Sequence, residues 1–239
     1  MPVSKERWQA AQAAEAAWWQ KQQDLILSPS YREEIKQRAN RLENWFQKHH
    51  QFTSESAILE IGGAATPMID HFSIGQKHAI DPLAHKYKEY FSNVLNSEVA
   101  YQTARGEELP FDDASFDIII SRNVLDHVES VDANLAEATR VLKPNGILYV
   151  AMNTFSGPLY AFKSVVRETE HPYIFTPDSF RRLLENKSFA IIEVVNDAPE
   201  NMAHFDDDIS SGSLMKKIIH KLFLGLNSYH FDEFILRKI

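Results

Sequence analysis

The stretch ILEIGGAATP, residues 58–67, joins a short apolar run to a turn made of small residues. The apolar run suits a buried strand, the small residues suit a tight turn, and the following MIDHF reads as the start of a helix. Such a unit leaves the N–H groups of the helix start beyond the strand end, where small residues let a ligand approach the backbone. The stretch is therefore a candidate ligand site, although an ordinary turn in an α/β core has the same pattern.

Beyond this turn, short apolar runs alternate with helical segments. The runs are AILEI, KHAID, DIIIS, GILYVAM and AIIEVV. This alternation predicts a doubly wound α/β fold, with a mostly parallel sheet covered on both faces. The final YHFDEFILRKI predicts a last, antiparallel strand, which we expect at an edge of the sheet.

The chain divides by pattern into a helical start and a longer α/β part. Helical spacing predicts helices over residues 4–23 and 31–48, which carry all four tryptophans and which we do not assign to the faces of the sheet. We therefore expect an N-terminal helical cap at residues 1–50 and a ligand-binding domain at 51–239. An insertion at about 197–228 is expected to shape the mouth of a pocket.

Composition narrows the possible partners. The 239 residues carry a net charge of −8 and contain no cysteine. The acidic balance disfavours a nucleic-acid partner, and the absence of thiols excludes disulfides and fits a reducing cytoplasm. Neither a secretory leader nor a membrane span is indicated by the sequence. The oligomeric state is not determined by these patterns.

Asp81 is the second candidate site residue. It ends the run KHAID, about 20 residues beyond the small-residue turn, where a carboxylate would hold ribose hydroxyls. A solvent-facing acid at the start of a loop is the alternative. The dinucleotide fingerprint G-x-G-x-x-G is not met, because Gly62 and Gly63 are adjacent.

Residues 104–153, which begin ARGEELPFDDASFDIIISRNVLDHV, complete a recognisable set. Together with ILEIGGAATP and AIDP, they resemble the class I S-adenosylmethionine-dependent methyltransferases, especially the small-molecule branch of ubiquinone and menaquinone methyltransferases. The resemblance is dense over residues 57–153 and fades over the first 50 residues and over 197–228. It implies a Rossmann-like fold, S-adenosylmethionine as cofactor and a small-molecule methyl acceptor.

The resemblance also implies roles for single residues. Its cofactor-binding positions are, in chain order, Glu60, Gly62, Gly63, Asp81, Gly106, Glu107, Ser121 and Asn123. The first three would lie beside the methionine part of the cofactor, and Asp81 would take the ribose hydroxyls. Gly106 and Glu107 would border the adenine, while Ser121 and Asn123 would face the sulfonium.

His127, in NVLDHV, is the candidate catalytic residue. An imidazole near neutral pH can accept a proton from a hydroxyl, which would suit methylation of oxygen, but a structural histidine at the start of a helix fits as well. No metal site is expected, because the acids near His204 are consecutive and no helical spacing links ligands.

Two alternatives to an active methyltransferase stay open. Ala64 and Thr66 stand where the family's turn usually continues with glycine, and Arg105 stands where the family often has an acid. These departures suit a catalytically inactive, cofactor-binding regulatory subunit. A nicotinamide-dependent oxidoreductase shares the fold layout, but the missing third glycine disfavours it.

Overall fold

The computed structural model describes residues 2–63, 65–91, 95, 98–157, 171–185, 189–197 and 228–239. The helices in these ranges are α1 (Lys5–Lys21), α2 (Gln23–Leu27), α3 (Pro29–His49), the 3₁₀ helix η1 (Met68–His71), α4 (Ala84–Phe91), α5 (Val131–Val141) and α7 (Pro177–Glu185). The strands are β1 (Ala57–Ile61), β2 (Gln76–Ile80), β3 (Ala100–Gln102), β4 (Phe116–Arg122), β5 (Leu142–Ser156), β6 (Phe189–Asp197) and β7 (Ser228–Lys238). The expected insertion at 197–228 lies almost wholly outside the described residues.

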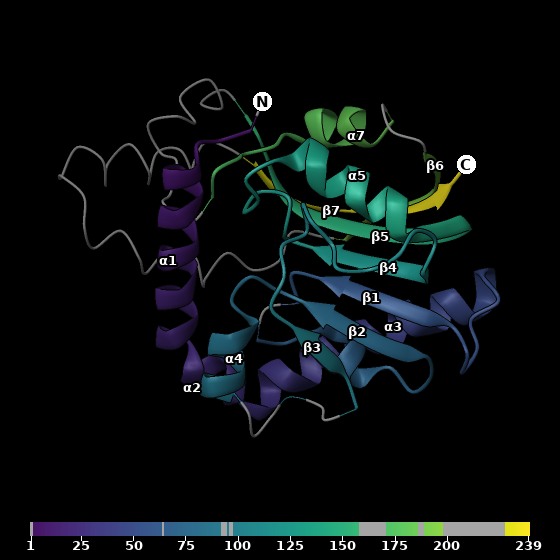
Figure 1. Ribbon diagram of the computed structural model, residues 1–239, viewed down its shortest axis with the longest axis horizontal. Helices are drawn as coiled ribbons and strands as arrows, with labels where there is room; N and C mark the ends of the chain where they lie inside the picture. Colours follow the sequence, from purple (N-terminus) through teal and green to yellow (C-terminus); the bar gives the residue numbers. More distant parts are fainter. Residues whose placement is uncertain are drawn as a thin grey trace.

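The strands form one seven-stranded sheet in the order β3-β2-β1-β4-β5-β7-β6. Strands β1 to β5 run parallel, and β7 pairs antiparallel with both β5 and β6. The order runs outward from β1 in both directions, which confirms the doubly wound sheet expected from the alternating runs. Because parallel strands share a direction, the residues that follow β1, β2 and β4 emerge at the same end of the sheet, the carboxyl end of these strands (Figure 1).

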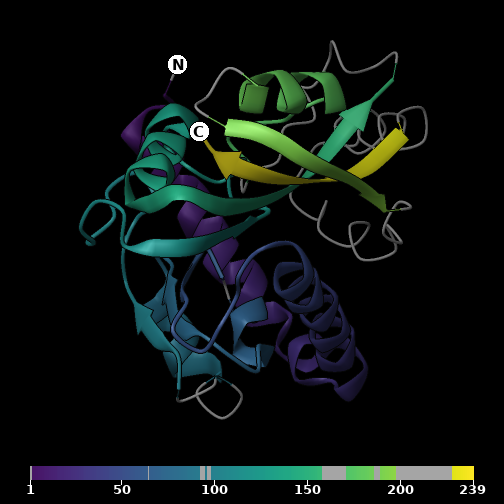
Figure 2. The same cartoon turned by 90° about the vertical axis from the view of Figure 1, so that its right-hand side faces the viewer.

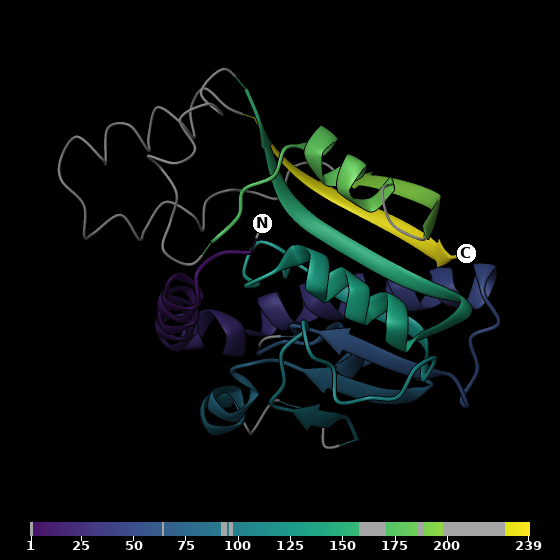
Figure 3. The same cartoon turned by 45° about the horizontal axis from the view of Figure 1, so that its top comes forward.

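Each face of the sheet is covered by helices. Alternate residues of β1 point to opposite faces: Leu59 joins a core with α5 and α7, whereas Ile58 joins a core with α3 and η1. Figures 2 and 3 show α5 and α3 on opposite sides of the sheet.

The last strand is not an edge strand, and our expectation on this point was wrong. β7 lies between β5 and β6, so β3 and β6 form the two edges. Residues 231–236 of β7 are all buried, including Asp232 and Glu233. The Tyr149 and Thr154 hydroxyls of β5 donate hydrogen bonds to Glu233 and Asp232, respectively. These two acids, which in the sequence suggest a solvent-exposed edge strand, therefore have partners inside the sheet.

The helix predicted over residues 31–48 corresponds to α3, and unlike our expectation it covers a face of the sheet. It buries Ile35, Ala39, Leu42 and Phe46 against the core that contains Ile58. A domain boundary near residue 50 therefore stays a prediction, and the helix free of the sheet faces is α1. In Figure 1, α1 stands across the end to which the β1 and β2 arrows point.

A short crossover between β1 and β2 replaces the helix expected at MIDHF. The helical structure in the described residues of this crossover is the single 3₁₀ turn η1. The Glu43 carboxylate of α3 accepts from the Ser73 and Ile74 N–H groups at 2.7 and 3.1 Å, just after η1 ends. Gly75, at φ +95°, then turns the chain into β2, so these contacts end the helix after one turn.

The Glu60 side chain fixes the start of this crossover. Its carboxylate oxygens accept from the Met68 and Ile69 N–H groups at 3.1 and 3.0 Å, and the residue is only 3% exposed. Burial raises the pKa of Glu60 to about 7, because the loss of hydration outweighs the two N–H bonds.

Replacing Phe46 tests whether α3 belongs to the core of the sheet. Because Phe46 is fully buried, we expect Phe46→Ala to lower the free energy of unfolding by about 3–5 kcal/mol. Urea unfolding measures this change, and Lys48→Ala, at an exposed position of the same helix, should change it by less than about 0.5 kcal/mol. Equal stabilities of the two variants would mean that α3 does not share the core.

Glu60 should make stability depend on pH. Its folded pKa of about 7 lies above the ordinary 4.5, so the folded protein holds a proton that the unfolded chain releases between these values. Stability should therefore fall as pH rises from about 4.5 to 7 and then level off, by at most ~3 kcal/mol. Chemical unfolding at several pH values, compared with Glu60→Gln, measures this term. A Gln variant with the same pH dependence as the wild type would contradict it.

Candidate active site

The turn after β1 is packed tightly against two neighbouring segments. Gly62 has φ +67°, and a Cβ atom there would lie 2.5 Å from the Val124 Cγ2 atom, in the loop after β4. The Gly62 N–H donates to the Ile80 carbonyl of β2 at 2.8 Å. A Cβ atom on Gly63 would lie 2.9 Å from the Pro67 Cγ atom. Both positions therefore require glycine, and the turn is tied to the ends of β2 and β4.

Asp81 lies beside this turn, as the strand pattern predicts. It follows β2, and its Oδ1 atom accepts from the Leu83 N–H at 2.8 Å, which shapes the start of α4. Asp81 lines a small pocket together with Gly63, Tyr87 and Tyr101, among other residues. Burial, and then the nearby carboxylates of Asp81 and Glu15, raise the pKa of the Tyr87 hydroxyl, which keeps its proton beside this pocket.

Gly106 and Glu107 lie in the connection from β3 to β4 and contact the segment that leads into α5. The Glu107 Oε1 atom accepts from the Glu129 and Ser130 N–H groups at 2.7 and 3.3 Å, just before α5 begins. Gly106 is buried, and a Cβ atom there would lie 2.1 Å from the Asn134 amide nitrogen of α5. The segment thus anchors the start of α5, and its predicted contact with adenine stays a prediction.

The end of β4 carries Ser121 and Asn123. The Ser121 hydroxyl is buried and makes no hydrogen bond within the described part of the chain. Asn123 adopts φ +52°, and its Oδ1 atom accepts from the Asn153 N–H of β5 at 3.0 Å. The Asn123 amide therefore holds β5 to the β4 turn, a role that the strand pattern did not predict.

Helix α1 makes contacts with the loops that follow several strands. The Arg105 guanidinium lies 4.3 Å from the centre of the Trp8 ring, and the Gln12 amide donates to the His127 carbonyl at 3.4 Å. Trp19 packs edge-on to Tyr87 of α4, with the ring centres 6.1 Å apart. Helix α1 lies across the carboxyl ends of the strands (Figure 1). Its tryptophan side chains contact Arg105 and Tyr87 there.

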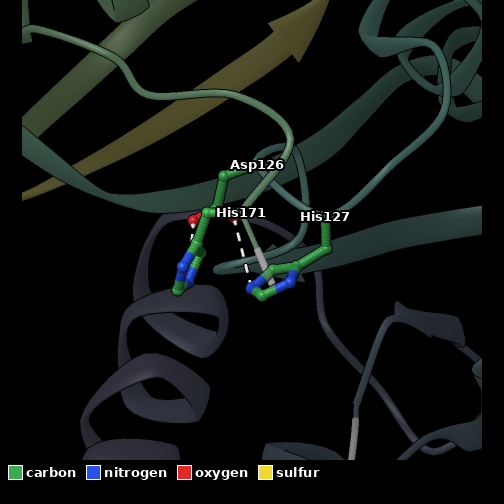
Figure 4. A group of neighbouring side chains, drawn as sticks. All are labelled: Asp126, His127 and His171. Carbon is green, nitrogen blue, oxygen red and sulfur yellow. Dashed lines mark ion pairs between the residues drawn. The ribbon is translucent and has the colours of Figure 1, made fainter. Parts of the chain in front are cut away.

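His127 lies in the turn between β4 and α5, before the helix begins, and not at its start as expected. Its Nε2 atom is 3.8 Å from the Asp126 Oδ1 atom, and its Nδ1 atom is 3.5 Å from the Glu15 Oε2 atom of α1. His171 approaches from a distant part of the chain, with its Nε2 atom 3.7 Å from the Asp126 Oδ2 atom. Figure 4 shows both imidazole rings near the Asp126 carboxylate.

Sequence reasoning missed three members of this group. Asp126 directly precedes His127 and was quoted in the same motif, so its position was a usable signal. Glu15 and His171 lie far from His127 along the chain, and no spacing links them to it. Only the packing of α1 and of the segment beginning at residue 171 brings them together.

The charged side chains beyond the carboxyl ends of the strands are mainly negative. Glu15, Asp81, Asp126 and Glu129 surround the strand ends, and Arg105 is paired with Glu129 at 2.7 Å. Carboxylates and backbone N–H groups together suit a ligand that carries both positive charge and a carboxylate.

Among the helices in the described ranges, none has the length and apolar content needed to cross a bilayer.

Comparison with known proteins agrees with this geometry. Residues 61–150 match the family model described as "Methyltransferase domain". The chain is 48% identical over 62 residues, 26% of its length, to the ubiquinone/menaquinone biosynthesis C-methyltransferase UbiE of Psychromonas ingrahamii, covering 24% of that protein. It is 28% identical over 194 residues, 73% of its length, to the mitochondrial 2-methoxy-6-polyprenyl-1,4-benzoquinol methylase of Pongo abelii, covering 55% of that protein.

A solved structure shares the fold. Geranyl diphosphate C-methyltransferase from Streptomyces coelicolor, crystallised with Mg²⁺, geranyl diphosphate and S-adenosyl-L-homocysteine, superposes with a TM-score of 0.61 at 10% identity, over 89% of this chain and 85% of that one. The matches to these two curated relatives span 24% and 55% of the relatives' own lengths. The chain is thus similar over residues 61–150 to the methyltransferase domain family, and its matched relatives include a ubiquinone/menaquinone biosynthesis C-methyltransferase.

Proposed function

We propose that this protein is a methyltransferase that moves a methyl group from S-adenosylmethionine to a small-molecule acceptor. The observation that carries the proposal is the meeting of the Gly62 turn with the end of β2, where the Gly62 N–H reaches the Ile80 carbonyl beside Asp81. In open α/β sheets, ligands bind beyond the carboxyl ends of the strands, where the chain diverges to either side. The matched family model begins at this turn.

The residues at this edge fit the proposed cofactor. Asp81 would accept from the ribose hydroxyls, because its carboxylate borders the pocket beside Gly63. The Ser121 hydroxyl is a buried polar group without a hydrogen bond in the described part of the chain, which fits a ligand group at the end of β4. Glu60 would not contact the cofactor directly, since its carboxylate accepts hydrogen bonds from the Met68 and Ile69 N–H groups of the crossover. It would instead hold the turn in position.

S-adenosylmethionine, when bound, would supply an activated methyl group for a single displacement at its sulfur-bound carbon. The protein's part is to position the two reactants and to exclude water. Trp8 and Trp19 of α1 lie over the strand ends and would provide an apolar wall. His127 would accept the proton released by a hydroxyl acceptor, with its ring held between Glu15 and Asp126.

The charge of the chain bears on the class of methyl acceptor. We propose a small molecule and no nucleic-acid partner, because the net charge is −8. A cytoplasmic location stays a prediction from the absence of cysteine.

Removing the Asp81 carboxylate tests the cofactor site. Each charge-assisted bond to a ribose hydroxyl contributes about 1.5–3 kcal/mol, so Asp81→Ala should weaken S-adenosylhomocysteine binding at least about tenfold. Asp81→Asn keeps an oxygen for the Leu83 N–H and is the variant that preserves the local fold. Calorimetric titration measures both, with Asp112→Ala, at an exposed position, as control. Unchanged affinity in both folded Asp81 variants would reject the assignment.

Deleting α1 tests its role as a wall. A chain that begins at residue 22 keeps Ile26 and α3, which pack in the remaining cores. We expect it to release S-adenosylhomocysteine at least about tenfold faster, because α1 no longer covers the strand ends. Transfer of labelled methyl groups from S-adenosylmethionine to a small-molecule extract should fall below detection. Full-rate transfer by the shortened chain would show that α1 only packs.

The same labelling experiment separates an active enzyme from an inactive cofactor-binding subunit. The full-length protein should incorporate label into a small molecule, whereas an inactive subunit would bind S-adenosylhomocysteine without any incorporation. NAD added to the calorimetric titration should give no heat of binding. A saturable NAD signal would instead favour an oxidoreductase.

A further inference from the structure

Asp126, His127 and His171 form a compact group of metal-type ligands. One ligand atom from each residue lies within 4.8 Å of the other two. They come from two segments, the turn after β4 and the segment that begins at residue 171, which meet again where the Tyr173 N–H donates to the Asp126 carbonyl at 3.2 Å. The backbone around the group is thus held on both sides.

One oxygen of the Asp126 carboxylate has no hydrogen-bond partner among the described residues. Its side chain is 7% exposed, and the buried Oδ1 atom accepts no hydrogen bond from the described residues. The two imidazoles stand 3.7 and 3.8 Å from its oxygens, beyond hydrogen-bond length. A buried carboxylate oxygen without a hydrogen bond is costly, and a cation bound between Asp126 and the two rings would remove that cost.

The Glu15 carboxylate lies near the second ring nitrogen of His127. Its Oε2 atom lies 3.5 Å from the His127 Nδ1 atom, on the side of the ring away from Asp126. A carboxylate on one ring nitrogen fixes the tautomer and leaves the other nitrogen as an electron-pair donor. The Nε2 atom faces Asp126, so the ring presents its donor to the shared space.

We propose that Asp126, His127 and His171 bind a divalent transition-metal ion of the Zn²⁺ or Fe²⁺ class. Two imidazoles and one carboxylate suit these ions, whereas Mg²⁺ prefers oxygen ligands alone. Bonds of about 2.0–2.2 Å require the three atoms to move closer together, which rotation of the two partly exposed imidazole side chains allows. Three protein ligands leave at least one position for water or an acceptor oxygen.

The Arg7 Nη2 atom donates to the His171 backbone carbonyl at 3.3 Å, on the main chain and not on the ring. In metal-loaded protein His127 is a ligand, so its role as a proton acceptor belongs to the metal-free protein. Metal binding is tested separately from the proposed methyl transfer, since it is measured without cofactor or acceptor.

Titration of the full-length, metal-free protein with Co²⁺ tests the site. We expect one equivalent to bind with visible absorption bands of a nitrogen-ligated ion and to be displaced by Zn²⁺. His171→Gln and Asp126→Asn should each weaken Co²⁺ binding at least tenfold, and Glu15→Gln about tenfold through the loss of its hold on His127. His85→Gln, at an exposed position of α4, is the matched control and should leave the affinity unchanged.

Circular dichroism shows which variants are folded. If Asp126→Asn does not fold, His127→Gln takes its place beside His171→Gln, since both imidazoles are partly exposed. Absence of Co²⁺ binding by the wild-type protein overturns the proposal. So does binding that the folded His171→Gln and His127→Gln variants retain in full, because the ion would then sit elsewhere on the chain.

Discussion

The buried Glu60 carboxylate is the constraint on which the arrangement of the site depends. A carboxyl group buried in a parallel sheet requires hydrogen-bond partners, and the Met68 and Ile69 N–H groups supply them. This ties the crossover back onto β1, where Pro67 leaves Gly63 no room for a Cβ atom; Val124, in the loop after β4, leaves none at Gly62. The small residues of the turn are thus required first by packing, and a ligand that approaches the turn uses a shape that Glu60 has already set.

Several side chains that the family resemblance assigns to the cofactor also hold the loops in place. Glu107 accepts from two N–H groups just before α5, and Asn123 accepts from the Asn153 N–H of β5. A ligand site built in this way is rigid, because each loop is fixed by side chains from its neighbours. Asp81 differs, since its carboxylate shapes the start of α4 and borders the pocket as well.

Helix α1 gives this edge its chemical character. It brings the Glu15 carboxylate to His127 and the Trp8 ring to Arg105. The same helix therefore contributes both an aromatic cover and an acidic partner at the strand ends. Because Ala11 and Ala16 are buried where α1 meets the domain, the helix approaches closely through small side chains and leaves the larger ones to reach over the loops.

The sequence by itself determined the sheet, its strands other than β3, the turn at Gly62 and the place of Asp81, because period, small residues and strand ends are local properties. Only the tertiary structure decided that β7 is interior, since the partners of Asp232 and Glu233 lie in β5, and that α3 covers a face of the sheet. It also decided the grouping of Asp126, His127 and His171 with Glu15. Contacts between segments so far apart in the chain depend on how the helices and loops pack, and no spacing in the sequence encodes that packing directly.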